Sequence, residues 1–95
     1  MLADVTLPDG VELARTTPEF TAETVPAGLL KAHQVAAEVW GRLCVLEGTV
    51  TFVAEGSGES RVLGAGDTQV IEPEMLHHVE PAEGARFVVE FHRRP

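Results

Sequence analysis

Residues 66–79 read Gly-Asp-Thr-Gln-Val-Ile-Glu-Pro-Glu-Met-Leu-His-His-Val, and this stretch decides how the chain is interpreted. Its Gly-Asp opening suits the tight backbone of a turn. The four residues that follow predict a short buried strand, which Pro73 ends because proline has no N–H to donate to a neighbouring strand. His77 and His78 then begin the next strand. Because side chains alternate along a strand, we expect one imidazole to face inward and the other outward.

Length and charge limit what the protein can be. Ninety-five residues are enough for one core and too few for two, so we expect a single domain over residues 1–95. Fifteen acidic side chains against seven basic ones give a formal charge of −8, which makes nucleic acid and anionic membranes poor partners. The single cysteine cannot form an internal disulfide. With no apolar run of membrane-spanning length, we expect a reduced, cytoplasmic protein.

Short strands at roughly ten-residue spacing account for most of the chain. Residues 39–46 and 49–54 are apolar and alternating, and Glu47-Gly48 between them predicts a hairpin turn. Residues 86–92 predict the last strand. Glycine-containing turns separate these segments, and no convincing helix interrupts them. The pattern indicates an antiparallel sandwich or barrel.

The first 39 residues are less regular. We expect residues 1–14 to form an edge hairpin around Pro-Asp-Gly or a loosely attached terminal strand. Residues 15–26 predict an extended segment laid against the sheet, with Phe20 and Val25 as its buried contacts. Residues 27–39 have partly helical spacing, but glycine and proline at their start favour a strand and a loop.

Two segments resemble the two sequence motifs of cupins, which are small jelly-roll barrels with an internal site. These segments are VLEGTV (residues 45–50) and GAGDTQVIEPEMLHHVEP (residues 64–81). Gly48 matches the turn glycine of the first motif, and the Gly-Asp, proline and histidine of residues 66–78 match the second. The resemblance implies an all-β fold: a cupin-type double-stranded β-helix (jelly-roll barrel) of two antiparallel sheets.

A narrower resemblance covers nearly the whole chain from Arg15 onward. RTTPEFTAETVPAGLLKAH, VWGRLCVLEGTVTF, VIEPEMLHHVEP and RFVVEFH look like the tellurite-resistance-protein-like small cupins, the TehB/YeaR-like family. In that family the first-motif histidine follows a Leu-Leu-Lys segment, which corresponds to His33. The second-motif histidine corresponds to His77 rather than His78, so His78 is expected on the outer face. The resemblance implies a link to tellurite or oxidative-type stress.

His33 and His77 are the candidate metal ligands. As neutral imidazoles converging in the barrel mouth they suit a divalent metal such as zinc, iron or nickel. Glu72 is the nearest carboxylate to His77 in sequence and is the candidate third ligand, as in a site with two histidines and one carboxylate. The alternative is that both histidines are hydrogen-bonding residues of a pocket without a metal.

The sequence departs from a general cupin in two places. Gly41 stands where the cupin resemblance implies a ligand glutamate, seven residues before the turn glycine. The His-x-His pair of the first motif is reduced to His33. The four-ligand set that the cupin resemblance implies is therefore incomplete.

Two of the other side chains in residues 39–46 and 86–92 admit two interpretations. Trp40 is a wall of the ligand pocket or a core or interface residue. Arg42 lies within an apolar run, where it either anchors an anionic ligand or forms a salt bridge with Glu90. Cys44 is expected to be an inert buried thiol. His92 is expected at the surface.

These observations lead to three hypotheses of function. The first is a small cupin that binds a divalent metal in the barrel mouth and acts as a binding or sensing module. The second is a metal-dependent enzyme of oxygenase or hydrolase type, in which an open metal position activates water or dioxygen. The third is a metal-free cupin whose pocket binds a small ligand. In each case we expect a small-molecule or oxyanion ligand and a homodimer, since exposed sheet edges tend to be covered.

Overall fold

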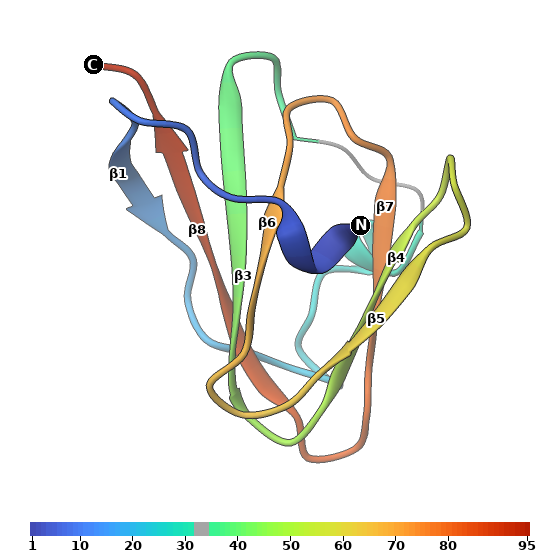
Figure 1. The fold of residues 1–95 in the computed structure, drawn as a ribbon. Coiled ribbons are helices and arrows are strands. Elements are labelled where there is room, and N and C mark those ends of the chain that lie inside the picture. The colour runs from blue at the N-terminus through green and yellow to red at the C-terminus, as the bar shows by residue number, and fades with distance from the viewer. Residues whose placement is uncertain (32–34) are drawn as a thin grey trace.

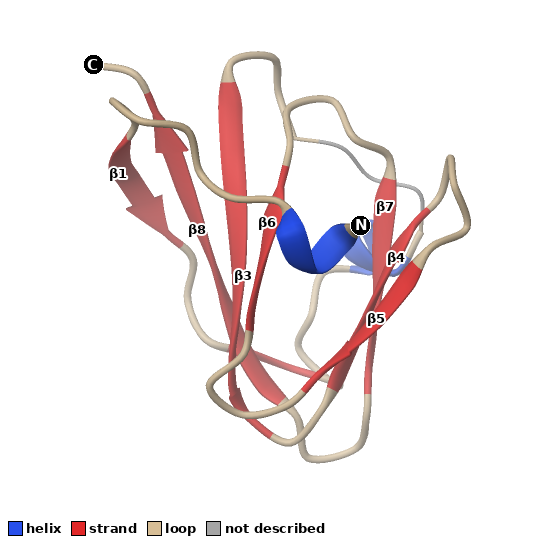
Figure 2. Cartoon of the chain, in the orientation of Figure 1, coloured by secondary structure: helices blue, strands red, loops and turns tan. Residues whose placement is uncertain are grey.

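The computed structural model, which describes residues 1–31 and 35–95, consists of two antiparallel sheets that face each other (Figure 1). Two short 3-10 helices, coloured blue in Figure 2, accompany them: η1 (Leu2–Asp4) and η2 (Ala27–Leu30). The strands are β1 (Glu12–Thr16), β2 (Phe20–Thr21), β3 (Val39–Glu47), β4 (Val50–Ala54), β5 (Ser60–Leu63), β6 (Thr68–Ile71), β7 (His77–Pro81) and β8 (Arg86–Arg93).

The larger sheet has the strand order β1-β8-β3-β6, with β2 also paired to β8. The smaller sheet has the order β5-β4-β7. The predicted all-β fold of two antiparallel sheets is therefore confirmed. In the part of the chain that the structure describes, no helix has the length and apolar character needed to cross a membrane.

The core lies between the sheets and follows the alternation of β3 and β8. Leu43 and Val45 on β3 face inward together with Phe87 and Val89 on β8, and each of these side chains is at most 8% exposed. Phe52 on β4 meets them from the smaller sheet and is fully buried. The residues between these positions point away from the core, as the period of two in a strand requires.

The turn between β3 and β4 confirms the predicted hairpin. Gly48 has a φ of +71°, a left-handed conformation that side chains with a Cβ avoid. A Cβ at this position would lie 2.9 Å from the Cα of Ala85 in the turn before β8. Glycine is required at the turn both by its backbone angle and by this close approach.

The N-terminal segment differs from the predicted hairpin. Residues 2–4, expected in the first strand of that hairpin, form the 3-10 helix η1 instead. This helix contacts both β5 and β6 and lies at the front of Figure 1. Leu2 is only 4% exposed and packs into the core. Its N–H donates to a carboxylate oxygen of Glu59 (2.9 Å), and its carbonyl accepts from the amide of the buried Gln69 (2.9 Å). These contacts attach residues 2–4 to both sheets.

Residues 15–26 follow the prediction more closely. They carry the end of β1 and the whole of β2, both paired with β8. Val25 is buried, and the ring of Phe20 meets Phe87 edge to face with centroids 5.8 Å apart. Residues 27–30 form η2 rather than the expected strand, and β3 begins at Val39, so in the described residues 27–31 and 35–38 that strand is not found.

Two glycine substitutions test the close contact at the β3–β4 turn. Gly66 also has a positive φ (+89°), but a Cβ there would meet no atom within 4 Å. We therefore expect Gly66→Ala to lower the free energy of unfolding by about 1 kcal/mol, the cost of the left-handed backbone alone. Gly48→Ala should cost about 2 to 3 kcal/mol, because the contact with Ala85 is added. Urea unfolding measures both, and equal losses would contradict this role of Ala85.

Candidate functional site

A cavity of about 280 Å³ lies between the two sheets. The larger sheet contributes Leu43, Ile71, Phe87 and Val89, β7 contributes Val79, and η2 contributes Leu29. Apolar side chains of both sheets and of η2 thus form most of its wall. The polar side chains at the cavity are Arg15, Thr17 and His77.

His77 is the buried polar group of this cavity. It is the first residue of β7 and is 2% exposed. Its ring stacks on Phe52 with centroids 5.2 Å apart, and its Nδ1 lies 2.9 Å from the carbonyl oxygen of Met75. A carbonyl only accepts, so Nδ1 carries a hydrogen and Nε2 is the basic nitrogen of the neutral ring. The expectation that His77 faces inward is confirmed.

Arg15 and Thr17 reach the cavity from the opposite sheet. The guanidinium carbon of Arg15 lies 5.4 Å from the ring centroid of Phe91, within the range of a cation–π contact. Arg15 itself is exposed, so it stands where the cavity meets solvent. The Thr17 hydroxyl accepts from the N–H of Val89 (3.0 Å) and donates to the carbonyl of Pro18 (2.9 Å).

No sequence pattern singles out Arg15 or Thr17 as a site residue. A single arginine in a polar segment is most often a solvated charge, and nothing local distinguishes this one. Its position follows from the pairing of β1 with β8, where Arg15 lies opposite Phe91. That pairing joins residues 76 positions apart in sequence, so no local pattern could have identified it.

The expected metal ligands are not brought together within the described residues. His33 lies outside the described ranges. Glu72 is exposed and is not among the residues that line the cavity with His77. In residues 1–31 and 35–95 no group of three or more histidine, cysteine, aspartate or glutamate side chains is placed to hold a metal ion.

Gly41 occupies an inward-facing position on β3, as the implied ligand glutamate would. A Cβ there would lie 3.3 Å from Cδ1 of Ile71 and 3.6 Å from a methyl carbon of Val35. Side chains of the core therefore occupy the space into which a longer side chain at position 41 would extend.

Trp40 and Arg42, the candidate pocket residues, lie on the other face of the larger sheet. Both alternate with the inward-facing Leu43, and neither lines the cavity that holds His77. The side chain of Arg94 lies over the Trp40 ring, 5.2 Å from its centroid. Trp40 and Arg42 thus face away from the candidate site.

The interpretation of Arg42 as a salt-bridge residue is confirmed. Its Nε and a terminal nitrogen lie 2.9 and 2.8 Å from one oxygen of Glu90, its neighbour across the β3–β8 ladder. His92 Nε2 lies 3.0 Å from the same oxygen. The expectation that His92 is a surface residue is wrong: it is only 8% exposed, on a strand with neighbours at both edges, where it lies opposite Trp40 on β3 and Leu13 on β1.

The cluster of Arg42, Glu90 and His92 shifts the pKa values of Glu90 itself and of the nearby Cys44. Burial tends to raise the pKa of Glu90, but the hydrogen bond from His92 and the charge of Arg42 outweigh it and leave the pKa lowered. Burial, with the nearby charge of Glu90, raises the pKa of the Cys44 thiol. Cys44 is therefore held as a thiol, in agreement with the expected inert cysteine.

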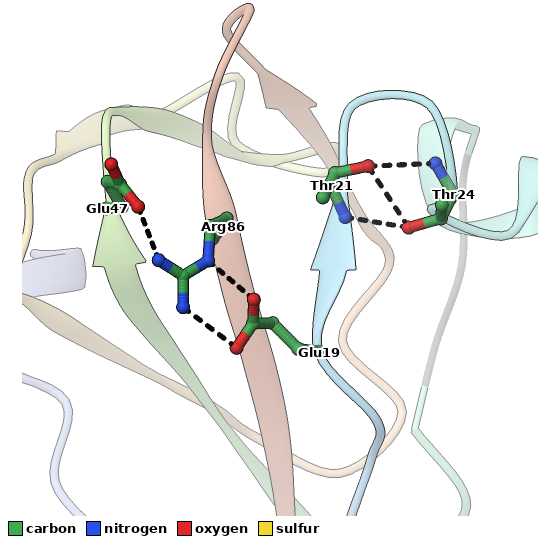
Figure 3. Close-up of polar contacts among 5 residues, drawn as sticks. All are labelled: Glu19, Thr21, Thr24, Glu47 and Arg86. Atoms are coloured by element: carbon green, nitrogen blue, oxygen red, sulfur yellow. Dashed lines mark hydrogen bonds and ion pairs between the residues drawn. The ribbon is translucent and has the colours of Figure 1, made fainter.

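Arg86 holds Glu19, which lies between the cavity residues Thr17 and Phe20. It donates to both carboxylate oxygens of Glu19 and also to Glu47 (Figure 3). The hydrogen bonds from Arg86 lower the pKa of Glu19. Beyond Glu19, Thr21 and Thr24 close a turn through their hydroxyl groups. β2 is thereby held against β8, with Phe20 at the cavity wall.

The model of the TehB-like domain matches residues 15–89 of this chain. The chain belongs to the TehB-like domain family. The match begins at Arg15, so β1 from that residue onward lies within the matched region, together with His77 and the first half of β8. The resemblance to this family is thereby confirmed.

Two solved structures are similar to this TehB-like domain. A crystal structure of a protein from E. coli strain K12, a structural genomics target, has a TM-score of 0.88 at 25% identity and covers 96% of this chain and 98% of its own. TehB from Haemophilus influenzae has a TM-score of 0.76 at 20% identity over 90% of this chain, which spans 32% of TehB. None of the curated proteins matches the chain.

His78 lies on the outer face of β7, as predicted, between two carboxylates. Its Nδ1 contacts Glu55, in the turn after β4, and its Nε2 lies 2.7 Å from Glu80. Hydrogen bonds to Glu80 and then to Glu55 raise the pKa of His78 above its ordinary value of 6.5. The protonated ring therefore links β7 to the end of the β4–β5 hairpin.

The sign of the resulting pH dependence follows from linkage. Because the folded-state pKa is raised, this stabilisation is fully present below pH 6.5 and is lost as the pH rises through the folded-state pKa. We expect His78→Gln to lower the free energy of unfolding more at about pH 6 than at about pH 9. The matched control is the same substitution with Glu55 and Glu80 already changed to glutamine, where the pH dependence should disappear. An equal loss at both pH values would contradict the proposed ion pairs.

Proposed function

We propose that this TehB-like domain is a cupin-type binding module whose cavity holds a small, largely apolar molecule. The observation that carries the proposal is the cavity between the sheets, with an apolar wall and a few polar groups at fixed places. Ligand sites commonly combine a mostly apolar wall with a small number of polar groups that orient the ligand. The cupin assignment rests on the motif resemblance and on the two antiparallel sheets.

The composition of the wall favours an organic ligand over ordered water. A buried water needs about three polar partners, and an apolar cavity offers few. At this cavity the Thr17 hydroxyl already has two hydrogen-bond partners. The remaining polar groups, on Arg15 and His77, reach the cavity from different sheets. A small molecule with an apolar body suits this arrangement better than a water cluster does.

A blocking variant tests the cavity as a binding site. Leu29 on η2 lines the cavity, whereas its neighbour Leu30 does not and is 44% exposed. We expect Leu29→Trp to abolish binding of small ring compounds such as benzamide and benzoate, because the indole fills the space they would occupy. The matched control Leu30→Trp should leave binding unchanged. Chemical-shift titration of methyl-labelled protein measures both.

Two results would contradict the binding proposal. One is that no compound of a broad panel of small apolar molecules and their carboxylates shifts the methyl signals of Val79 and Val89, which line the cavity. The other is that Leu29→Trp and Leu30→Trp reduce binding equally, since the effect would then not come from the cavity.

A divalent metal at the same place is a second candidate, and one observation favours it. Metal-binding histidines usually donate their other ring N–H to a carbonyl or carboxylate, and Nδ1 of His77 is placed to donate to Met75. The described residues alone do not complete a ligand set. The candidate therefore depends on His33, outside those residues, and no reaction step is assigned to the metal.

Metal analysis of protein purified without an affinity tag tests this candidate. If His77 is a ligand, a stoichiometric metal in the wild type should be lost in His77→Gln and kept in the matched control His78→Gln, whose side chain faces outward. Retention in His77→Gln, or no metal in the wild type after reconstitution with zinc, iron or nickel, would contradict it.

The physiological setting is proposed from the family resemblance. The resemblance to tellurite-resistance proteins makes tellurite, an oxyanion, one of the ligands to be tested in the binding assay. Homodimerisation and a cytoplasmic location stay predictions of the sequence.

A further inference from the structure

We infer that the ligand of the cavity is an anion with an apolar body, of the class of small monocarboxylates, and that Arg15 binds its charged group. This inference rests on the proposed binding function and adds the chemical class of the ligand. It starts from one feature of the site, an arginine at the solvent-facing edge of an otherwise apolar cavity.

Three other arginines of the protein have hydrogen-bonding partners within the chain. Arg42 pairs with Glu90, and Arg86 pairs with Glu19 and Glu47. Arg61 donates to the carbonyl of Thr68 and to the side chain of Gln69. The structural role of these arginines is therefore accounted for by partners within the chain.

Arg15 differs from them. Within the described residues it forms no ion pair and donates no side-chain hydrogen bond; its contact is with the face of the Phe91 ring. The aromatic contact holds the guanidinium at the cavity, yet it uses none of the five N–H donors that suit a carboxylate. Arg15 is thus positioned by its neighbour and still able to bind an anion.

The carboxylates nearest to Arg15 in the sequence do not pair with it. Glu19, four residues later in the chain, is held by both of its oxygens on Arg86 (Figure 3). Glu12 is exposed and lies opposite Arg93 in the β1–β8 register. In a protein with a formal charge of −8, a cation left without a carboxylate partner at a cavity is a site where an anion can be attracted locally.

The placement of the charge also fits the ligand class. An ionised carboxylate is costly to bury without a partner, so it should stay where it meets both Arg15 and water. The apolar body can then enter between the sheets, among side chains such as Val79 and Phe87. An anion without an apolar body would leave this space unused, and a neutral molecule would leave Arg15 unused.

Two probes of nearly the same shape, benzoate and benzamide, test the charge preference. We expect the wild type to bind benzoate at least about tenfold more tightly than benzamide, as expected for a charge-assisted hydrogen bond at a partly exposed site. Arg15→Gln should weaken the binding of benzoate by about the same factor and leave the affinity for benzamide unchanged. Arg15→Lys should retain part of the preference because the charge remains.

The matched control is Arg93→Gln, which makes the same change of charge at an exposed arginine on β8 that does not line the cavity. It should leave the preference for benzoate intact. Equal affinities of the wild type for the two probes, or equal effects of Arg15→Gln and Arg93→Gln, would overturn the inference while leaving the cavity a binding site. Failure of both probes and of the wider panel to bind the wild type would instead overturn the proposed function.

Discussion

Strands β3 and β8 pair antiparallel from Val39 opposite Arg93 to Glu47 opposite Arg86, and the positions of the other elements depend on this ladder. Its register determines which side chains form the core and which lie on the outer face. On the inner face it brings Leu43 opposite Val89. β1 and β2 then pair with the free edge of β8, and β6 pairs with the free edge of β3. A slip of one residue would reverse both faces.

The same register separates the roles of the polar residues. On the outer face it places Arg42 opposite Glu90, where an ion pair with His92 beside it stabilises the sheet without reaching the cavity. At the edge of the sheet the β1–β8 pairing places Arg15 opposite Phe91, at the cavity and without a carboxylate partner within the described residues. The ion pair of Arg42 and Glu90, which supports the fold, and Arg15, which is proposed to bind the ligand, thus lie on different faces of one sheet.

Much of the fold could be predicted from local patterns, and much of the site could not. The β3–β4 hairpin follows from Gly48 and its alternating flanks. Alternation predicted that His77 and His78 face opposite sides, and the family resemblance selected His77 as the inward one. The burial of His92 was missed because its strand neighbours, Trp40 and Leu13, are more than fifty residues earlier in the chain. Arg15 was missed for the same reason, since only the β1–β8 pairing brings it to the cavity.

We propose that the space between the sheets is a binding site whose charged end is Arg15. A crystal structure of the protein grown with benzoate tests this most directly. We expect the ring to lie between the two sheets and the carboxylate to lie within hydrogen-bonding distance of the Arg15 guanidinium. Benzoate bound elsewhere, or a cavity closed by the side chains of Leu29 and Phe87, would contradict it.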